Sequence, residues 1–122
     1  MRTYILAIAL ALSASSAFAV STCDTMPTKS QQNDCWSNVI TDEYQQADEY
    51  LVAVQTSRKV PAVVKQQVEA RRQAIAPEAN RQCKKDELGY PENACLINHI
   101  QTFKDFTYQQ TSKYGVRDQR LN

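Results

Sequence analysis

The sequence contains few of the residues and patterns that β-sheet proteins require. Among its 122 residues there are only two glycines, Gly89 and Gly115, and no stretch shows sustained alternation of polar and β-branched side chains. Hairpin turns favour glycine, and half-buried strands show that alternation, so their scarcity argues against a sheet. We therefore expect the chain to be helical.

The sequence also lacks the usual signatures of enzymes and of nucleotide-binding proteins. It has one histidine, His99, and it contains neither a glycine-rich phosphate loop nor a G-x-S-x-G motif. Its cysteines do not form the close C-x2-4-C pairs that are typical of structural zinc sites. We therefore expect no enzymatic activity, no cofactor and no bound metal, and we interpret His99 as a surface or half-buried helical residue.

Neither sign of charge is in excess, and long apolar runs are missing after the first residues. With 14 basic and 13 acidic residues the formal net charge is +1, which gives no reason to expect nucleic acid or an anionic membrane as a partner. Beyond residue 20, no segment approaches the run of about 20 apolar residues that a transmembrane helix needs.

The first 19 residues have the pattern of a secretory signal. Arg2 precedes an apolar run over residues 4–12, and the small residues that follow end in Ala-Phe-Ala. We expect cleavage after Ala19, which would leave one domain of residues 20–122 that is periplasmic or secreted. Lipid attachment at Cys23 is the less favoured alternative, because Thr22 is bulkier than the residue usual before a lipidated cysteine.

All four cysteines lie after this leader, at Cys23, Cys35, Cys83 and Cys95. An even number of cysteines in an oxidising compartment predicts two disulfides. Eleven residues separate the first two cysteines, and eleven separate the last two. Pairing within each set would close a short loop in the unfolded chain. In the chain-entropy model this constraint stabilises the folded state by roughly 3 kcal/mol for each bond. Four cysteines allow three pairings, however, and the sequence leaves the crossed ones open.

Apolar residues over residues 28–57 recur at steps of three or four, which places them on one face of a helix. This helix can begin at Thr28, because Thr28 and Gln31 have the spacing of a capping box. The apolar stripe consists of Trp36, Ile40, Ala47, Leu51 and Val54, with Tyr44 beside it.

Two further helices are expected. Pro61 suits the first turn of a second helix, which should extend to about residue 84 with a kink or restart near Ile75, because Pro77 removes an intrahelical hydrogen bond. The third helix should run to about Tyr114 and stop at Gly115, followed by a frayed tail. The predicted fold class is all-α: a small bundle of about three helices held by two disulfides.

The first two helices differ in charge. Residues 24–57 carry six acidic residues and one basic residue, whereas residues 58–85 carry eight basic and two acidic residues. A short connection would make these helices antiparallel neighbours with complementary charges. The acidic band of Asp42, Glu43, Asp48 and Glu49 is therefore open to two interpretations: a docking face for a cationic partner, chiefly through Asp42 and Glu49, or a solvated face that pairs with the second helix. Neighbouring exposed carboxylates do not provide the pocket or the separation of a glycosidase pair.

A turn-containing loop over residues 84–93 joins the second and third helices. If Cys83 and Cys95 are bridged, the loop is ordered before it binds, which lowers the entropic cost of inserting it into a cleft. Tyr90 is the candidate anchor, with Lys85, Asp86 and Glu87 as further contact residues. The alternative is a loop that only connects two helices.

The cysteine frame and four segments resemble the LprI-type lysozyme inhibitor N-terminal domain. The segments are Gln32–Cys35, Tyr44–Leu51, Val68–Gln73 and Cys95–Leu96. The family usually has a tryptophan where Ile75 stands and an arginine near Ala79. The resemblance implies an exported protein of the bacterial envelope that binds and inhibits lysozyme-like muramidases. The alternative is a non-enzymatic structural or interaction module of the envelope with another protein partner.

Overall fold

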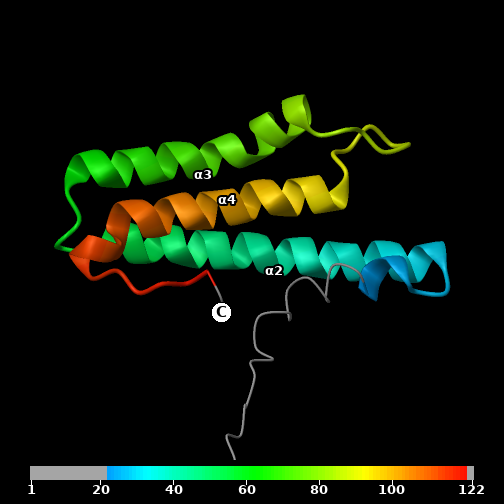
Figure 1. The fold of residues 1–122 in the computed structure, drawn as a ribbon, viewed down its shortest axis with the longest axis horizontal. Helices are drawn as coiled ribbons and strands as arrows, with labels where there is room; N and C mark the ends of the chain where they lie inside the picture. The colour runs from blue at the N-terminus through cyan, green and yellow to red at the C-terminus, as the bar shows by residue number, and fades with distance from the viewer. Residues whose placement is uncertain (1–21, 121–122) are drawn as a thin grey trace, which may run out of the picture.

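Three long helices account for most of residues 22–120, which are the residues that the computed structural model describes (Figure 1). They are α2 (Lys29–Thr56), α3 (Ala62–Gln82) and α4 (Asn93–Thr111), and a short 3-10 helix, η1 (Ser112–Tyr114), follows α4. α3 runs antiparallel to α2, and α4 packs against both. The described residues contain no strand longer than the single bridge between Lys85 and Pro91. The all-α prediction is confirmed.

The helix ends follow the local sequence. The Thr28 hydroxyl accepts a hydrogen bond from the Gln31 amide at 3.1 Å and caps α2, as the capping-box spacing predicts. Gly115, at a φ of 80°, takes the left-handed conformation that ends η1. The helix α3 continues through Pro77 to Gln82, so it does not restart, and Figure 1 shows its last turns rising away from the line of the earlier ones.

Two hydrophobic clusters hold the bundle. The larger joins all three helices through eight buried residues, which are Ala47, Tyr50, Val54, Val60, Val68, Ile75, Ile100 and Phe103. The smaller lies near the start of α2 and consists of Cys23, Trp36 and Ile97. The Trp36 indole nitrogen donates a hydrogen bond to Asp24 at 3.1 Å, so its one polar atom is satisfied at the edge of this cluster.

A charged side chain lies inside the bundle between α4 and α2. Lys104 is 2% exposed, and its ammonium nitrogen lies 2.8 Å from Glu43 and donates a hydrogen bond to Gln46 at 2.8 Å. The Glu43 contact is an ion pair that lacks the alignment of a hydrogen bond. Removing either charge would leave the other buried without its partner, a change that costs about 3–5 kcal/mol.

The complementary charges of α2 and α3 meet as predicted. The Arg72 guanidinium of α3 donates to Asp48 of α2 at 2.6 Å and lies 4.9 Å from the centre of the Tyr44 ring. Burial raises the pKa of the Tyr44 phenol, an effect that Arg72 partly offsets. This pair fixes the register of two antiparallel neighbours more than it adds stability, because such exposed pairs are worth about 0–1 kcal/mol.

The tail after Gly115 is not frayed, contrary to the sequence expectation. Residues 116–120 fold back along the bundle, and the Arg120 guanidinium lies 3.8 Å from the centre of the Tyr108 ring. Arg120 also pairs with Asp118 at 2.8 Å and with Asp105 at 3.4 Å. Hydrogen bonds from Arg120 lower the pKa of Asp118. The cation–π contact and the two ion pairs explain why a polar tail docks.

The predicted signal peptide, residues 1–19, lies outside the described residues. Between residues 22 and 120, none of the helices combines the length and the apolar character that a membrane crossing needs.

Candidate functional site

The two disulfides pair neighbouring cysteines. Cys23 is bonded to Cys35, and Cys83 is bonded to Cys95, with Cα–Cα distances of 5.4 and 5.8 Å. The local pairing is confirmed and the crossed pairings are excluded. We call these bonds the arm disulfide (Cys23–Cys35) and the loop disulfide (Cys83–Cys95). Such bonds fit an oxidising, extracytoplasmic compartment.

The loop disulfide closes the base of a loop over residues 84–92, the tip loop, which projects from the end of the bundle where α3 gives way to α4 (Figure 1). Two backbone hydrogen bonds join its strands, from Asp86 N–H to Tyr90 O at 2.7 Å and from Glu92 N–H to Lys84 O at 2.9 Å. Gly89 takes the turn at a φ of 83°, where a side chain would be strained. The tip loop is a small hairpin with a covalent base.

Asp86 braces the tip loop from inside. Its carboxylate accepts hydrogen bonds from the Leu88 and Tyr90 amides, both at 2.9 Å, in the manner of an Asx turn. Lys85 is also committed within the molecule, because its ammonium group donates to Asn80 at the end of α3. Of the contact residues proposed from sequence, Lys85 and Asp86 therefore support the loop, while Tyr90 and Glu87 face solvent.

The tip loop carries two exposed apolar side chains, which are separated in the sequence by one residue. Leu88 is 81% exposed and Tyr90 is 65% exposed, and no other large hydrophobic residue among those described is as exposed as Leu88. Sequence reasoning selected Tyr90 and missed Leu88. The Leu-Gly-Tyr-Pro run was the available signal, since a glycine turn between two apolar residues displays both.

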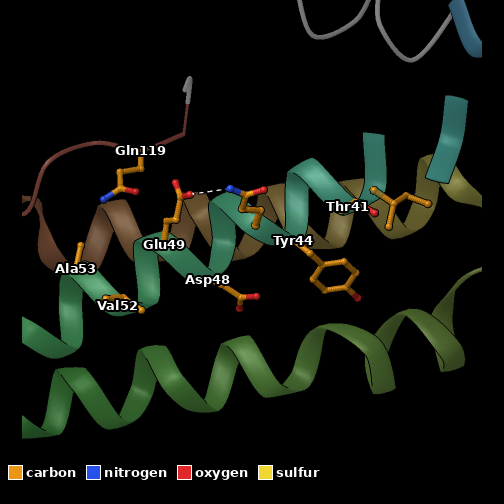
Figure 2. Close-up of a pocket in the computed structure, with 9 residues that line it drawn as sticks. Thr41, Tyr44, Asp48, Glu49, Val52, Ala53 and Gln119 are labelled. Carbon is orange, nitrogen blue, oxygen red and sulfur yellow. Dashed lines mark hydrogen bonds between the residues drawn. The ribbon is translucent and has the colours of Figure 1, made fainter. Parts of the chain in front are cut away.

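A second candidate surface is an open, mostly apolar groove along the outer side of α2 (Figure 2). We call it the α2 groove; α2 and residue 119 of the tail line it through Ile40, Thr41, Tyr44, Gln45, Asp48, Glu49, Val52, Ala53 and Gln119. In Figure 2, Tyr44 and Asp48 point toward α3, whereas Glu49 lies beside Gln119. Val52 is 58% exposed, so this apolar surface is open to solvent.

The structure divides the acidic band predicted on the first helix. Glu43 turns into the bundle toward Lys104, and Asp48 pairs with Arg72. Asp42 and Glu49 remain exposed, and Glu49 accepts a hydrogen bond from Gln45 at 3.1 Å. Half of the band therefore pairs within the molecule, and docking of a partner at Asp42 and Glu49 stays a prediction.

His99 is the only histidine in the sequence, but in the structure it lies near two cysteines. Its ring nitrogen and the sulfurs of Cys83 and Cys95 all lie within 4.8 Å of one another, the one such group of three potential metal ligands among the described residues. With the loop disulfide formed, the two sulfurs are bonded to each other and are not thiolate ligands.

Compared with known proteins, the chain matches no family model, no curated protein and no solved structure. The LprI-type resemblance therefore stays a prediction from sequence.

Proposed function

We propose that the protein is a non-enzymatic inhibitor that binds a lysozyme-like muramidase by inserting the tip loop into its cleft. The main support is that Leu88 and Tyr90, which are 81% and 65% exposed, lie on a loop whose conformation is fixed without a partner. The LprI-type resemblance supplies the class of target.

The energetics favour such a loop as a binding element. Ordering a flexible side chain on binding costs about 0.5–1.5 kcal/mol, and ordering loop backbone costs more. Here the loop disulfide, Asp86 and Gly89 fix the backbone before contact. Burial of an aromatic and an aliphatic anchor in a cleft can then contribute to affinity with little of that cost.

The exposed acids of α2 would assist encounter. Asp42 and Glu49 lie on a helix that is rich in acidic residues, and a cationic muramidase would be attracted to this side of the molecule before the loop engages. Because exposed charges are screened over about 8 Å at physiological ionic strength, this contribution should fade as salt is added.

The test is to titrate the purified, oxidised protein into lysozyme acting on peptidoglycan at low and moderate salt. We expect Leu88→Ala and Tyr90→Ala each to weaken inhibition about 30-fold at both salt concentrations. Charge reversal of Asp42 and Glu49 should act mainly at low salt. Val63→Ala is the matched control, because Val63 is an exposed apolar residue of α3, far from the tip loop in the chain.

Two results would contradict the proposal. Absence of inhibition at micromolar excess would remove the muramidase as target. Inhibition that survives both Leu88→Ala and Tyr90→Ala would remove the tip loop as the inhibitory element.

A second candidate function rests on the α2 groove. An apolar surface edged by the exposed Glu49 suits an interaction module that binds a cationic amphipathic segment of another envelope protein. Val52→Glu separates the two functions, because it should abolish binding in the groove and leave inhibition through the tip loop unchanged.

A further inference from the structure

We propose that Cys83, Cys95 and His99 form a zinc site when a dithiol reductant opens the loop disulfide. The three donor atoms already lie within 4.8 Å of one another at the junction of α3 and α4. Tetrahedral zinc with bonds of about 2.3 Å to sulfur and about 2.0–2.1 Å to nitrogen places such donors roughly 3.5–3.8 Å apart. Once the bond is opened, the two sulfurs must move apart and the His99 nitrogen must lie closer to them to reach that spacing.

The backbone presents the donors in a chelating arrangement. Cys95 and His99 are four residues apart within α4, so they share one face of the helix. Cys83 follows the last residue of α3 and comes from the opposite side of the junction. Two ligands on one helical turn and a third from a neighbouring segment give three protein ligands, with water left to complete the tetrahedron.

The surroundings favour the metal-bound form. Cys83 is 7% exposed, and Cys95 and His99 are half-buried, so the site is partly shielded from water. Cys95 lies in the first turn of α4, where the helix dipole stabilises a thiolate. Glu78, Arg71 and His99 line the same small cavity between α3 and α4.

The chemistry balances in two steps. The dithiol transfers two electrons and two protons to the loop disulfide and is itself oxidised to a disulfide, leaving two thiols on the protein. Zinc then binds both sulfurs as thiolates and the neutral imidazole of His99, and two protons are released. The metal thereby replaces the lost covalent bond at the base of the tip loop.

The arm disulfide provides an internal control, because among the described residues no third ligand atom groups with the sulfurs of Cys23 and Cys35 in a way that could hold a metal ion. The decisive experiment uses two variants of the full chain, one with Cys23→Ser and Cys35→Ser, the other with Cys83→Ser and Cys95→Ser. Each is reduced with a dithiol, freed of reductant without air, and titrated with Co²⁺ as a spectroscopic probe and then with Zn²⁺.

We expect the variant that keeps Cys83 and Cys95 to bind one Co²⁺ with thiolate-to-metal absorption in the near ultraviolet, and Zn²⁺ to displace it. Adding His99→Ala should weaken binding by more than about 10-fold, since even groups one shell further out are worth about 10–100-fold. Asn98→Ala, at the neighbouring exposed position, should leave affinity unchanged.

Circular dichroism keeps the test valid if reduction unfolds the chain. Helical signal that is lost on reduction and returns when Zn²⁺ is added supports the site, because metal binding is then coupled to folding. Helical signal that survives reduction shows that the Co²⁺ titration reports on the folded chain. The proposal is overturned if no thiolate absorption appears, if His99→Ala binds as tightly as its parent, or if the variant that keeps Cys23 and Cys35 binds equally well. It does not depend on the proposed inhibition, since every readout is made without a muramidase.

Discussion

The two disulfides close segments of the same length, with a sequence separation of 12 in each, yet they act on different surroundings. The arm disulfide lies in a hydrophobic cluster with Trp36 and Ile97, and Cys23 is completely buried. The loop disulfide stands at the base of the tip loop, whose apolar side chains point into solvent. The equal spacing predicts that both bonds constrain the unfolded chain equally. Their surroundings differ, because one bond is part of a hydrophobic cluster and the other holds a loop with exposed apolar side chains.

The largest expected effect is on the arm disulfide. Cys23→Ala with Cys35→Ala should lower the free energy of unfolding by about 4 kcal/mol, roughly 3 from the lost cross-link and about 1 from the loosened contacts around Trp36. Urea denaturation of the variant and of the parent protein measures this difference in the free energy of unfolding. The same pair of changes at Cys83 and Cys95 serves as the matched control and should cost about 3 kcal/mol. A larger loss at the loop disulfide would reverse the comparison.

The opposite order is expected for partner binding. Loss of the arm disulfide should leave the affinity of the folded protein for its partner unchanged, whereas loss of the loop disulfide should weaken it about 10-fold, because the tip loop must then be ordered on contact. Calorimetry at a temperature where both variants are folded measures the two affinities. Equal affinities would show that the loop disulfide is not needed to preorganise the loop.

A smaller effect is expected inside the tip loop. Asp86→Ala removes the two hydrogen bonds that the Asp86 carboxylate accepts from backbone amides of an exposed turn, and it should lower global stability by no more than about 1 kcal/mol. Hydrogen exchange at the Leu88 and Tyr90 amides should nevertheless accelerate strongly, since these are the groups that Asp86 accepts from. Glu87→Ala, at the adjacent position, should change neither. Unchanged exchange in Asp86→Ala would mean that the loop disulfide alone fixes the tip.

The smallest effect concerns the docked tail, which is held without any disulfide. Arg120 lowers the pKa of Asp118 below its ordinary value of 3.8, so the pairing stabilises the docked tail fully above that pH and is lost as the pH falls through the lowered value. The Tyr108 ring resonances should therefore shift on acidification as Arg120 leaves the ring. In Asp118→Asn the Tyr108 ring resonances should not shift in this pH range. A shift that persists in this variant would show that Asp118 is not the group responsible.

Features that depend on neighbouring residues could be predicted, and features that depend on distant partners could not. The stripe through Ala47 and Val54 and the cap at Thr28 were predicted because periodicity and capping are local. The inward turn of Glu43 depends on Lys104, which is far away in the sequence. The docking of Arg120 likewise depends on where the fold places its aromatic partner.

The candidate site follows the same division. The turn at Gly89 could be inferred from the residues of the loop itself, and so could the choice of Tyr90 as a candidate anchor. The internal role of Asp86 was missed, because a carboxylate that caps a turn and one that contacts a partner look alike in sequence. The spacing of Cys95 and His99 was visible, but only the bridge to Cys83 brings a third donor to them.

The buried pair of Lys104 and Glu43 limits how this protein can evolve. Because Lys104 is almost completely enclosed, a mutation of either residue alone would strand an uncompensated charge away from water. Substitution by two aliphatic side chains of similar volume would be tolerated, but only if both changes occur together. Descendants of this chain should therefore carry either both charges or neither, so residues 43 and 104 should change together.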